Sequence, residues 1–433
     1  MGGFRRAASA PPSARPGRPA RPRGPWPILA GLVLLALLAG LAGCQSYQGE
    51  AEDRLRHAMS GEGPVVVAVV SSSSVPNLIS QGAQLAARWI NDRGGVLGGR
   101  RLELIHLDDE GRLPVGEKIA RRLAGNKEVV AVVGHLYSEV AVPVSIIYGA
   151  SGLLFISTGA TDPQFSLIPN PYSLRVVPND GVTALAMAEL AHKLGLNNLV
   201  VTFQRGLNST FYGRSLANSF SAVAVDQGLN ILHVRSFFPW QEDLRPMLAP
   251  MRHEKLDGLV AIGFLPQLGE LISQARSLSM RATILGSDSL DDPDLLTLPN
   301  RAAEGVIVAS FFRDDLTRPA TRDFVTGFRK AFAKTPDDHA AAAFDAVMLI
   351  AAACQKAGSS VPLDLANALT YHENFPGASS VYNFSPDGDP TGRWIWFKEV
   401  KDGKFVYLPN EYQPQNPAHL DGVASPKSVD PAE

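Results

Sequence analysis

The sequence predicts an α/β protein that is built from two doubly wound lobes. In residues 129–162, two short apolar runs flank a helix-length segment, as buried parallel strands and their crossover helix do. A second series of strand-length and helix-length segments follows over residues 180–309. The chain has 433 residues, 45% of them hydrophobic, which suffices for two cores at roughly 100–200 residues per domain.

The N-terminus has the pattern of a secretion signal. The first 26 residues contain six arginines and no acid, and an apolar run over residues 28–41 leads into Leu-Ala-Gly-Cys. About 14 apolar residues are too few for a comfortable membrane span. The pattern resembles a bacterial lipoprotein signal, so we expect residues 1–43 to be removed and Cys44 to carry the lipid. An uncleaved anchor and a chance cysteine remain as alternatives.

Charge and cysteine content exclude several classes of protein. Without the signal, 34 basic residues face 42 acidic ones, a formal charge of −8, so we expect no nucleic-acid partner. Cys354, the only other cysteine, lies in an apolar helical run and is expected in the core. No disulfide can form within the mature chain, and no Cys/His cluster has metal-binding spacing, so we expect neither a metal nor a cofactor.

The first lobe follows a short polar segment. Residues 44–63 are expected to be a tether. The pattern then predicts strands at 65–70, 102–107, 129–133 and 153–156, and helices at 77–91, 115–123 and 139–148. The acidic pair Asp108-Asp109 ends the second strand, and we expect these carboxylates to cap loop amides, with acid–base chemistry or a metal as the alternative.

The second lobe begins after a strand at 174–178. It is predicted to contain helices at 183–193, 211–226 and 267–277 and strands at 198–202, 231–235 and 259–262. A strand at 305–310 returns to the first lobe, which takes helices at 321–332 and 338–356. The chain crosses again near 381–384, and a hairpin of 393–400 and 404–407 packs on lobe two. The expected division is 64–179 with 310–381 for lobe one, 180–309 with 382–408 for lobe two, and 409–433 for a disordered tail.

Small polar residues directly follow two neighbouring strands of lobe one. In an open parallel sheet such turns face the ligand crevice. We expect Ser138 to cap the following helix, whose free N–H groups suit a carboxylate, and the Gly159 carbonyl and Thr161 to suit an ammonium. This arrangement predicts a site for a zwitterion. Capping alone remains an alternative for Ser138 and Thr161, and His135 is interpreted as a packed turn residue.

Three segments carry a family resemblance. They resemble segments of the solute-binding proteins of branched-chain amino acid ABC transporters, which are type I periplasmic binding proteins. The three segments are GHLYS, the later ISTGATDP, and INDRGGVLGGRRLELIHLDDEG. The resemblance runs from Val65 to about Val406. It implies two Rossmann-like lobes joined by a three-crossing hinge. It also implies a binding site for an amino acid, in which Ser138 holds the ligand carboxylate. The ligand ammonium is then held by Gly159, Thr161 and Asp288. An aromatic wall is formed by Tyr212 and Phe264.

Some of these roles have alternatives, and some residues depart from the family. Tyr212 and Phe264 could be inter-lobe core, and Asp288 could be exposed loop charge. The loop SSSSVPNLISQ after the first strand is shorter than in the family, which could widen the pocket or remove small-molecule binding. The family's disulfide is missing, with Glu110 and Tyr137 near its positions, and Tyr137 could fill part of the cleft.

The leading hypothesis is a lipid-anchored extracytoplasmic protein that closes on a small amino-acid-like or amide-like ligand and presents it to an ABC permease. Gln45 favours the outer membrane in a two-membrane bacterium, and the cell surface is the site in a one-membrane bacterium. One alternative is an envelope lipoprotein of the same fold that acts as a protein-binding activator or sensor. A remote one is a serine hydrolase with Ser138 as nucleophile and His135 as base, although no G-x-S-x-G elbow is present.

Overall fold

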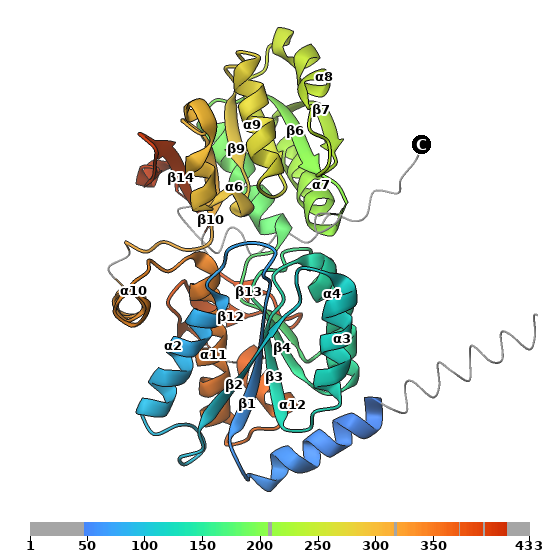
Figure 1. Ribbon diagram of the computed structural model, residues 1–433, viewed down its shortest axis with the longest axis vertical. Helices are drawn as coiled ribbons and strands as arrows, with labels where there is room; N and C mark the ends of the chain where they lie inside the picture. Colours follow the sequence, from blue (N-terminus) through green and yellow to red (C-terminus); the bar gives the residue numbers. More distant parts are fainter. Residues whose placement is uncertain (1–46, 207–209, 316–317, 372, 393–394, 414–433) are drawn as a thin grey trace, which may run out of the picture. The chain divides into compact units, whose positions relative to one another are not determined.

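The computed structural model describes residues 47–206, 210–315, 318–371, 373–392 and 395–413 (Figure 1). The signal sequence and Cys44 therefore lie outside the described residues. Within them the chain forms two main sheets, each flanked by helices, and one small sheet. This arrangement confirms the predicted α/β class.

The lobe-one sheet is entirely parallel, in the order β2-β1-β3-β4-β5. Its central strands are buried along their whole length, which explains their continuous apolar sequence. The strands are β1 (Val65–Ser71), β2 (Leu102–Asp108), β3 (Val129–Gly134), β4 (Leu154–Ser157) and β5 (Ser173–Arg175).

Helices cover both faces of this sheet (Figure 1). The pair α2 and α11 packs together on one face, and α3 and α4 pack on the other. The helices of this lobe are α2 (Ile79–Asp92), α3 (Leu113–Ala124), α4 (Ser138–Ala150), α5 (Gln164–Leu167), α10 (Pro319–Phe332), α11 (Asp338–Ala357) and α12 (Pro362–Thr370). By length and composition α11 could cross a membrane, but it is mostly buried here as a core helix. It holds Cys354, which is fully buried as predicted, and burial raises the pKa of this thiol to about 12.

The lobe-two sheet is mixed, in the order β15-β14-β10-β9-β8-β6-β7. Neighbouring residues of β6 alternate between faces: Leu199 and Val201 pack toward α6 and α7, whereas Val200 joins the core beneath α9. The strands are β6 (Asn198–Gln204), β7 (Asn230–Phe237), β8 (Gly258–Ile262), β9 (Thr283–Gly286), β10 (Ile307–Ser310), β14 (Trp396–Lys401) and β15 (Lys404–Tyr407). The helices are α6 (Asp180–Lys193), α7 (Thr210–Asp226), α8 (Arg245–Leu248), α9 (Gln267–Ser277) and the short 3₁₀ turns η2 (Ala249–His253), η3 (Asp288–Leu290), η4 (Pro293–Thr297), η5 (Pro299–Arg301) and η6 (Asn410–Tyr412).

The chain passes between the two sheets three times, after β5, after β10 and before β14. Asp389 links the first and third passages. Its carboxylate accepts hydrogen bonds from Arg175 Nε at 2.6 Å and from Asn179 Nδ2 at 2.8 Å, and also bonds with Ser166. A fully buried guanidinium thus joins two segments that are more than 200 positions apart in sequence.

The strand at 305–310 does not return the chain to lobe one as we expected. β10 pairs with β9 in parallel and with β14 in antiparallel orientation, so it lies inside the lobe-two sheet. The crossing comes after it. Likewise, β12 (Val381–Phe384) does not open the last part of lobe two, because it pairs with β11 (Phe375–Pro376) and β13 (Pro390–Thr391) in the small sheet.

The expected tether over residues 44–63 is corrected by the structure. Residues 47–60 form a helix that packs on lobe one. Arg54 on this helix is fully buried, and its guanidinium donates to five carbonyl oxygens of lobe one. A charge pattern that looks solvent-exposed in sequence therefore contains one residue whose partners come from distant segments.

The start of the expected tail is also corrected. Residues 410–413 pack against lobe two through Gln413, which is almost fully buried. Its side chain accepts from Phe397 N at 2.9 Å and donates to the carbonyls of Phe397 and Leu408. The rest of the tail lies outside the described residues.

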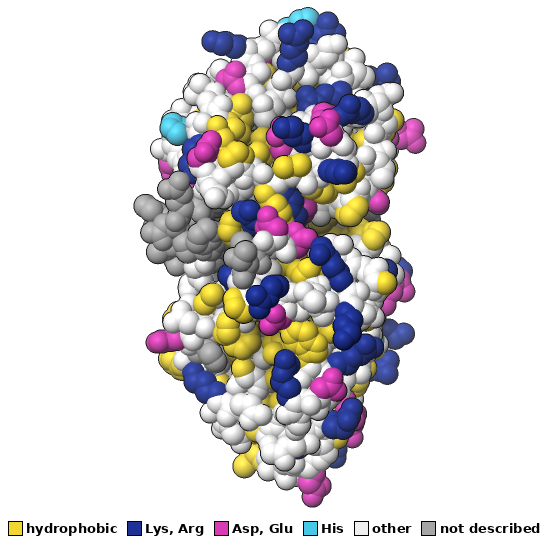
Figure 2. Space-filling view, turned by 90° about the vertical axis from the view of Figure 1, so that its left-hand side faces the viewer, with side chains coloured by type: hydrophobic (Ala, Val, Ile, Leu, Met, Phe, Trp, Pro, Cys, Tyr) yellow, Lys and Arg dark blue, Asp and Glu magenta, His cyan; other side chains and the backbone are white. Residues whose placement is uncertain are grey.

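Basic and acidic side chains are interspersed over the described part of the face shown in Figure 2.

Candidate functional site

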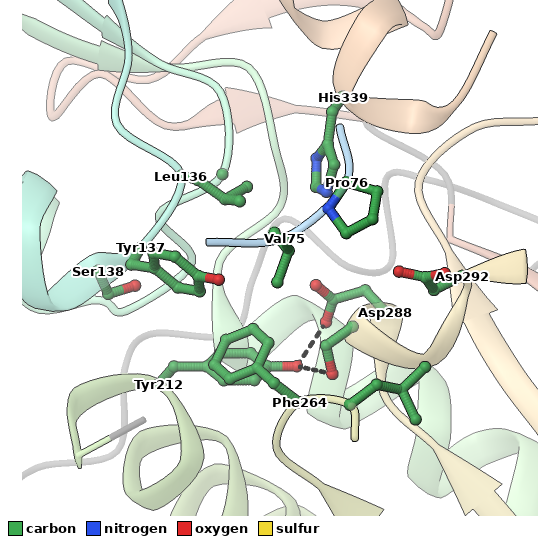
Figure 3. Close-up of a pocket in the computed structure, with 13 residues that line it drawn as sticks. Val75, Pro76, Leu136, Tyr137, Ser138, Tyr212, Phe264, Asp288, Asp292 and His339 are labelled. Atoms are coloured by element: carbon green, nitrogen blue, oxygen red, sulfur yellow. Dashed lines mark hydrogen bonds between the residues drawn. The ribbon is translucent and has the colours of Figure 1, made fainter. Parts of the chain in front are cut away.

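A cavity lies where strand ends of both lobes face each other (Figure 3). It contains about 640 Å³ of empty space, part of it open to solvent. Its walls come from the segments after β1, β3 and β4 in lobe one and after β8 and β9 in lobe two, together with the start of α7 and α11. This is the edge at which parallel sheets bind ligands. The lining residues are Val75, Pro76, Leu136, Tyr137, Ser138, Gly159, Tyr212, Phe264, Leu265, Asp288, Ser289, Asp292 and His339.

Ser138 lies on the cavity wall, but it does not cap α4 as we expected. It is the first residue of that helix, and Tyr137 occupies the capping position without a side-chain hydrogen bond. Instead, the Ser138 hydroxyl oxygen accepts from the backbone N–H groups of Thr161 and Asp162, each at 3.2 Å. A hydroxyl has two acceptor positions and one donor, so Ser138 keeps its proton to donate.

Gly159 contributes backbone to the cavity wall, directly beside the Leu136 segment. A Cβ at Gly159 would lie 2.4 Å from the Leu136 carbonyl oxygen, so no other residue could bring the two loops this close. The loops after β3 and β4 thus form one continuous wall.

Thr161 is not among the residues that line the cavity, so the direct ammonium contact of its hydroxyl stays a prediction. Thr161 is buried behind Ser138, where its amide binds the Ser138 hydroxyl and its carbonyl accepts from Asp180 N at 2.8 Å. The reason is that the loop after β4 folds back against α4. Thr161 therefore positions Ser138 from behind.

Three aromatic rings form one side of the cavity (Figure 3). Phe264 packs edge-on against Tyr137 of lobe one, with ring centroids 5.1 Å apart, and lies 5.2 Å from Tyr212. Tyr137 therefore fills part of the cleft, as its position beside Ser138 suggested. Both Tyr212 and Phe264 line the cavity, and both also pack against other aromatic rings. They are therefore part of the cavity wall and part of the packing between the lobes at the same time.

Asp288 faces this aromatic wall from the loop after β9. Its carboxylate accepts a hydrogen bond from the Tyr212 hydroxyl at 3.0 Å (Figure 3). Burial raises the pKa of Asp288 to about 7, and the Tyr212 hydrogen bond opposes this shift only in part. A ligand cation at this position would favour the ionised carboxylate.

A second carboxylate connects the lobes next to the cavity. Glu139, at the start of α4, accepts a hydrogen bond from Phe211 N of α7 at 2.7 Å. Burial raises the pKa of Glu139 to about 7, and the Phe211 amide opposes the shift. The contact places the first turn of α4, and with it Ser138, against lobe two.

His135 is a packed turn residue, as predicted. Its ring is fully buried, with Nδ1 2.8 Å from Asp109 Oδ2 and Nε2 2.8 Å from the Tyr148 hydroxyl. Since both ring nitrogens already have partners, His135 does not act as a base for Ser138, and this geometry does not support the serine hydrolase. Asp108 and Asp109 accept from the loop amides of Ser73, Glu110 and Gly111, which confirms the predicted capping.

Val75 and Pro76 come from the shortened loop after β1, which the sequence connected with the pocket without indicating these two residues. The sequence did not point to His339, which comes from the start of α11. His339 has no local motif, and it reaches the cavity because α11 packs along α2. Asp292 was noted only as a neighbouring charge.

A sequence profile of the periplasmic binding protein family matches residues 67–404. The chain belongs to this family. Its members are substrate-binding proteins, and they work outside the cytoplasm. The fold is that of the type I periplasmic binding proteins.

Relatives with similar chains are named for aliphatic amino acids. The Leu/Ile/Val-binding protein BraC3 of Rhizobium johnstonii is 27% identical, over 76% of this chain and 88% of its own. The leucine-specific-binding protein of Salmonella typhimurium is 26% identical, over 70% and 82%. A solved ABC transporter substrate-binding protein of Desulfitobacterium hafniense in complex with Leu is 30% identical, with a TM-score of 0.72 over 80% of this chain and all of its own.

Proposed function

We propose that this periplasmic binding protein is a lipid-anchored solute-binding protein that closes on a small amino-acid-like ligand and delivers it to an ABC permease. The observation that carries the proposal is the hydroxyl of Ser138. Both of its acceptor positions are taken by backbone amides, so its free proton suits an acceptor such as a ligand carboxylate. Asp288, on the lobe-two side of the same cavity, suits the ammonium.

Contacts from both lobes are what lobe closure requires. A ligand can shift an opening equilibrium only by as much as it binds the closed state more tightly than the open one. Charge-assisted hydrogen bonds contribute about 1.5–3 kcal/mol each, so one from Ser138 and one to Asp288 would stabilise the closed form substantially.

The shortened first loop and Gln45 both favour the alternative of a scaffold that binds only proteins. Val75 and Pro76 of this loop nevertheless line the cavity, beside polar groups from both lobes, which supports a small-molecule site.

The proposal predicts that at least one free α-amino acid binds the full-length chain with micromolar or tighter affinity. Isothermal titration calorimetry against a panel of the common amino acids is the test, and the corresponding amino amides are the matched controls, since they lack the carboxylate. Binding of the acid but not of its amide supports the proposal. If no amino acid of the panel gives binding heat, the proposal is wrong and the protein-binding alternative takes its place.

The lipid anchor is tested separately. Substituting Cys44→Ser removes the thiol that carries the lipid, so we expect the protein to move from the membrane fraction to the soluble fraction of the cell envelope. Cys354→Ser is the control, because that thiol is buried in lobe one and should not affect location. If the Cys44→Ser protein still sediments with membranes, something other than a lipid holds it there.

A further inference from the structure

More acidic than basic side chains line the cavity. Asp288 and Asp292 line it, and the single basic side chain among its described lining residues is His339. Two more carboxylates, Asp337 and Asp338, adjoin His339 at the start of α11 and, together with Asp288 and Asp292, raise its pKa. Acidic side chains therefore outnumber basic ones around the cavity.

An α-amino acid with an aliphatic side chain leaves this excess in place. Under the proposed function, its carboxylate accepts a hydrogen bond from Ser138 and its ammonium pairs with Asp288. Such a ligand has no further charge that could pair with Asp292. Asp292 would then face hydrocarbon. Asp292 already has the Asp294 amide and the nearby charge of His339 as partners, and an aliphatic ligand would remove water from the carboxylate without adding another, which is unfavourable.

Asp292 is positioned to contact the far end of a ligand. In the view of Figure 3 it lies on the opposite side of Asp288 from Ser138, beyond the expected ammonium site. One of its oxygens accepts from Asp294 N at 2.8 Å at the start of η4. No described residue donates a hydrogen bond to the other carboxylate oxygen. That oxygen of Asp292 can therefore accept a hydrogen bond from a ligand.

The aromatic wall is a second and independent feature. Tyr137, Tyr212 and Phe264 present three ring systems to one cavity. The face of an aromatic ring attracts cations, and it does so more strongly when water is excluded. Rings and carboxylates together form a lining that suits a positively charged organic group.

We propose that the ligand carries a second positive charge at the end remote from its carboxylate, so that the site prefers a cationic amino acid to an aliphatic one, with Asp292 as the specificity-determining residue. This inference rests on the proposed function. It differs from the aliphatic ligands for which the relatives are named.

Two matched pairs of ligands test the inference on the full-length chain. Lysine and norleucine share the same carbon chain and differ by the terminal ammonium, and ornithine and norvaline form the same pair one methylene shorter. By calorimetry we expect the cationic member of at least one pair to bind about tenfold or more tightly than its neutral partner. If the neutral members bind equally well or better, the charge inference fails while the proposed function stands. If none of the four binds and the wider amino-acid panel is silent, the proposed function fails and this inference fails with it.

The substitution Asp292→Asn then tests whether Asp292 causes the preference for the cationic ligand. The amide oxygen of Asn can still accept from Asp294 N, so we expect the fold to be kept, and thermal unfolding checks this. The variant should lose most of the preference for the cation, while its affinity for the neutral partner stays the same or rises, because an amide is less costly to cover with hydrocarbon than a carboxylate. Asp294→Asn, on the exposed side of the same turn, is the control. Unchanged discrimination in Asp292→Asn would overturn the role of Asp292.

Discussion

Replacing Arg54 by methionine should lower the free energy of unfolding by about 3–5 kcal/mol, because it leaves buried carbonyl oxygens without a donor. The guanidinium donates to Val129 O at 2.8 Å, to Leu123 O and Ala124 O at 3.1 and 2.6 Å, and to Asn126 O at 3.2 Å, and also bonds with Ser151 O. Burial lowers the pKa of Arg54 to about 10, which still leaves it charged at neutral pH. Methionine fills similar space but donates nothing.

Urea unfolding of the two proteins measures the effect. Arg56→Met is the matched control: Arg56 is on the same helix, its side chain is 68% exposed, and it pairs only with acids of that helix, so its loss should change stability little. We also expect faster proteolysis near residues 47–60 in the Arg54 variant. If Arg54→Met unfolds at the same urea concentration as the wild type, the hydrogen bonds of Arg54 contribute little to stability and this prediction is wrong.

Ser138→Ala should weaken binding of the tightest amino acid at least tenfold, since a hydrogen bond to a charged group contributes about 1.5–3 kcal/mol. The structure adds an effect that the sequence did not suggest. The amides of Thr161 and Asp162 lose their acceptor, so the variant should also lose about 1–3 kcal/mol of stability. Affinity and unfolding must therefore be measured together, at a temperature where both proteins are folded.

The control for this pair of effects is Ser145→Ala. Ser145 is buried on the same helix, and its hydroxyl donates to the Val142 carbonyl at 2.7 Å, away from the cavity wall. We expect unchanged affinity in this variant. A Ser138→Ala protein that binds as tightly as the wild type would mean that the carboxylate is held elsewhere, and the donor assigned to Ser138 would have to be abandoned.

Much of the site follows from one local rule. Ligand-facing residues come directly after buried parallel strands, so Ser138 and Gly159 can be found from strand ends alone. Phe264 and Asp288 also follow buried strands, β8 and β9, but their roles and that of Tyr212 came from the family resemblance. Asp292 and His339 were not predicted, because an acid in a loop or a residue at the start of a helix can face solvent, the core or a ligand, and the local sequence does not distinguish these cases.

The tertiary contacts also reversed several local interpretations. Ser138 looked like a helix cap, yet its partners are amides 23 and 24 positions away. The charged segment over residues 47–60 looked like a tether, yet Arg54 donates to carbonyls that are 69 to 97 positions away. Hydrogen-bond partners at such separations leave no pattern in neighbouring residues.

The chain therefore encodes its architecture locally: apolar runs of strand length, helical periodicity and turn residues are short-range properties, and they determine two α/β lobes and the edge where a ligand binds. The partners of individual polar groups are long-range. Whether Ser138 caps or donates, whether Thr161 reaches the ligand, and which charges share the cavity with Asp288 depend on how loops from both lobes pack together, because a hydrogen bond is set by a few tenths of an ångström rather than by residue type.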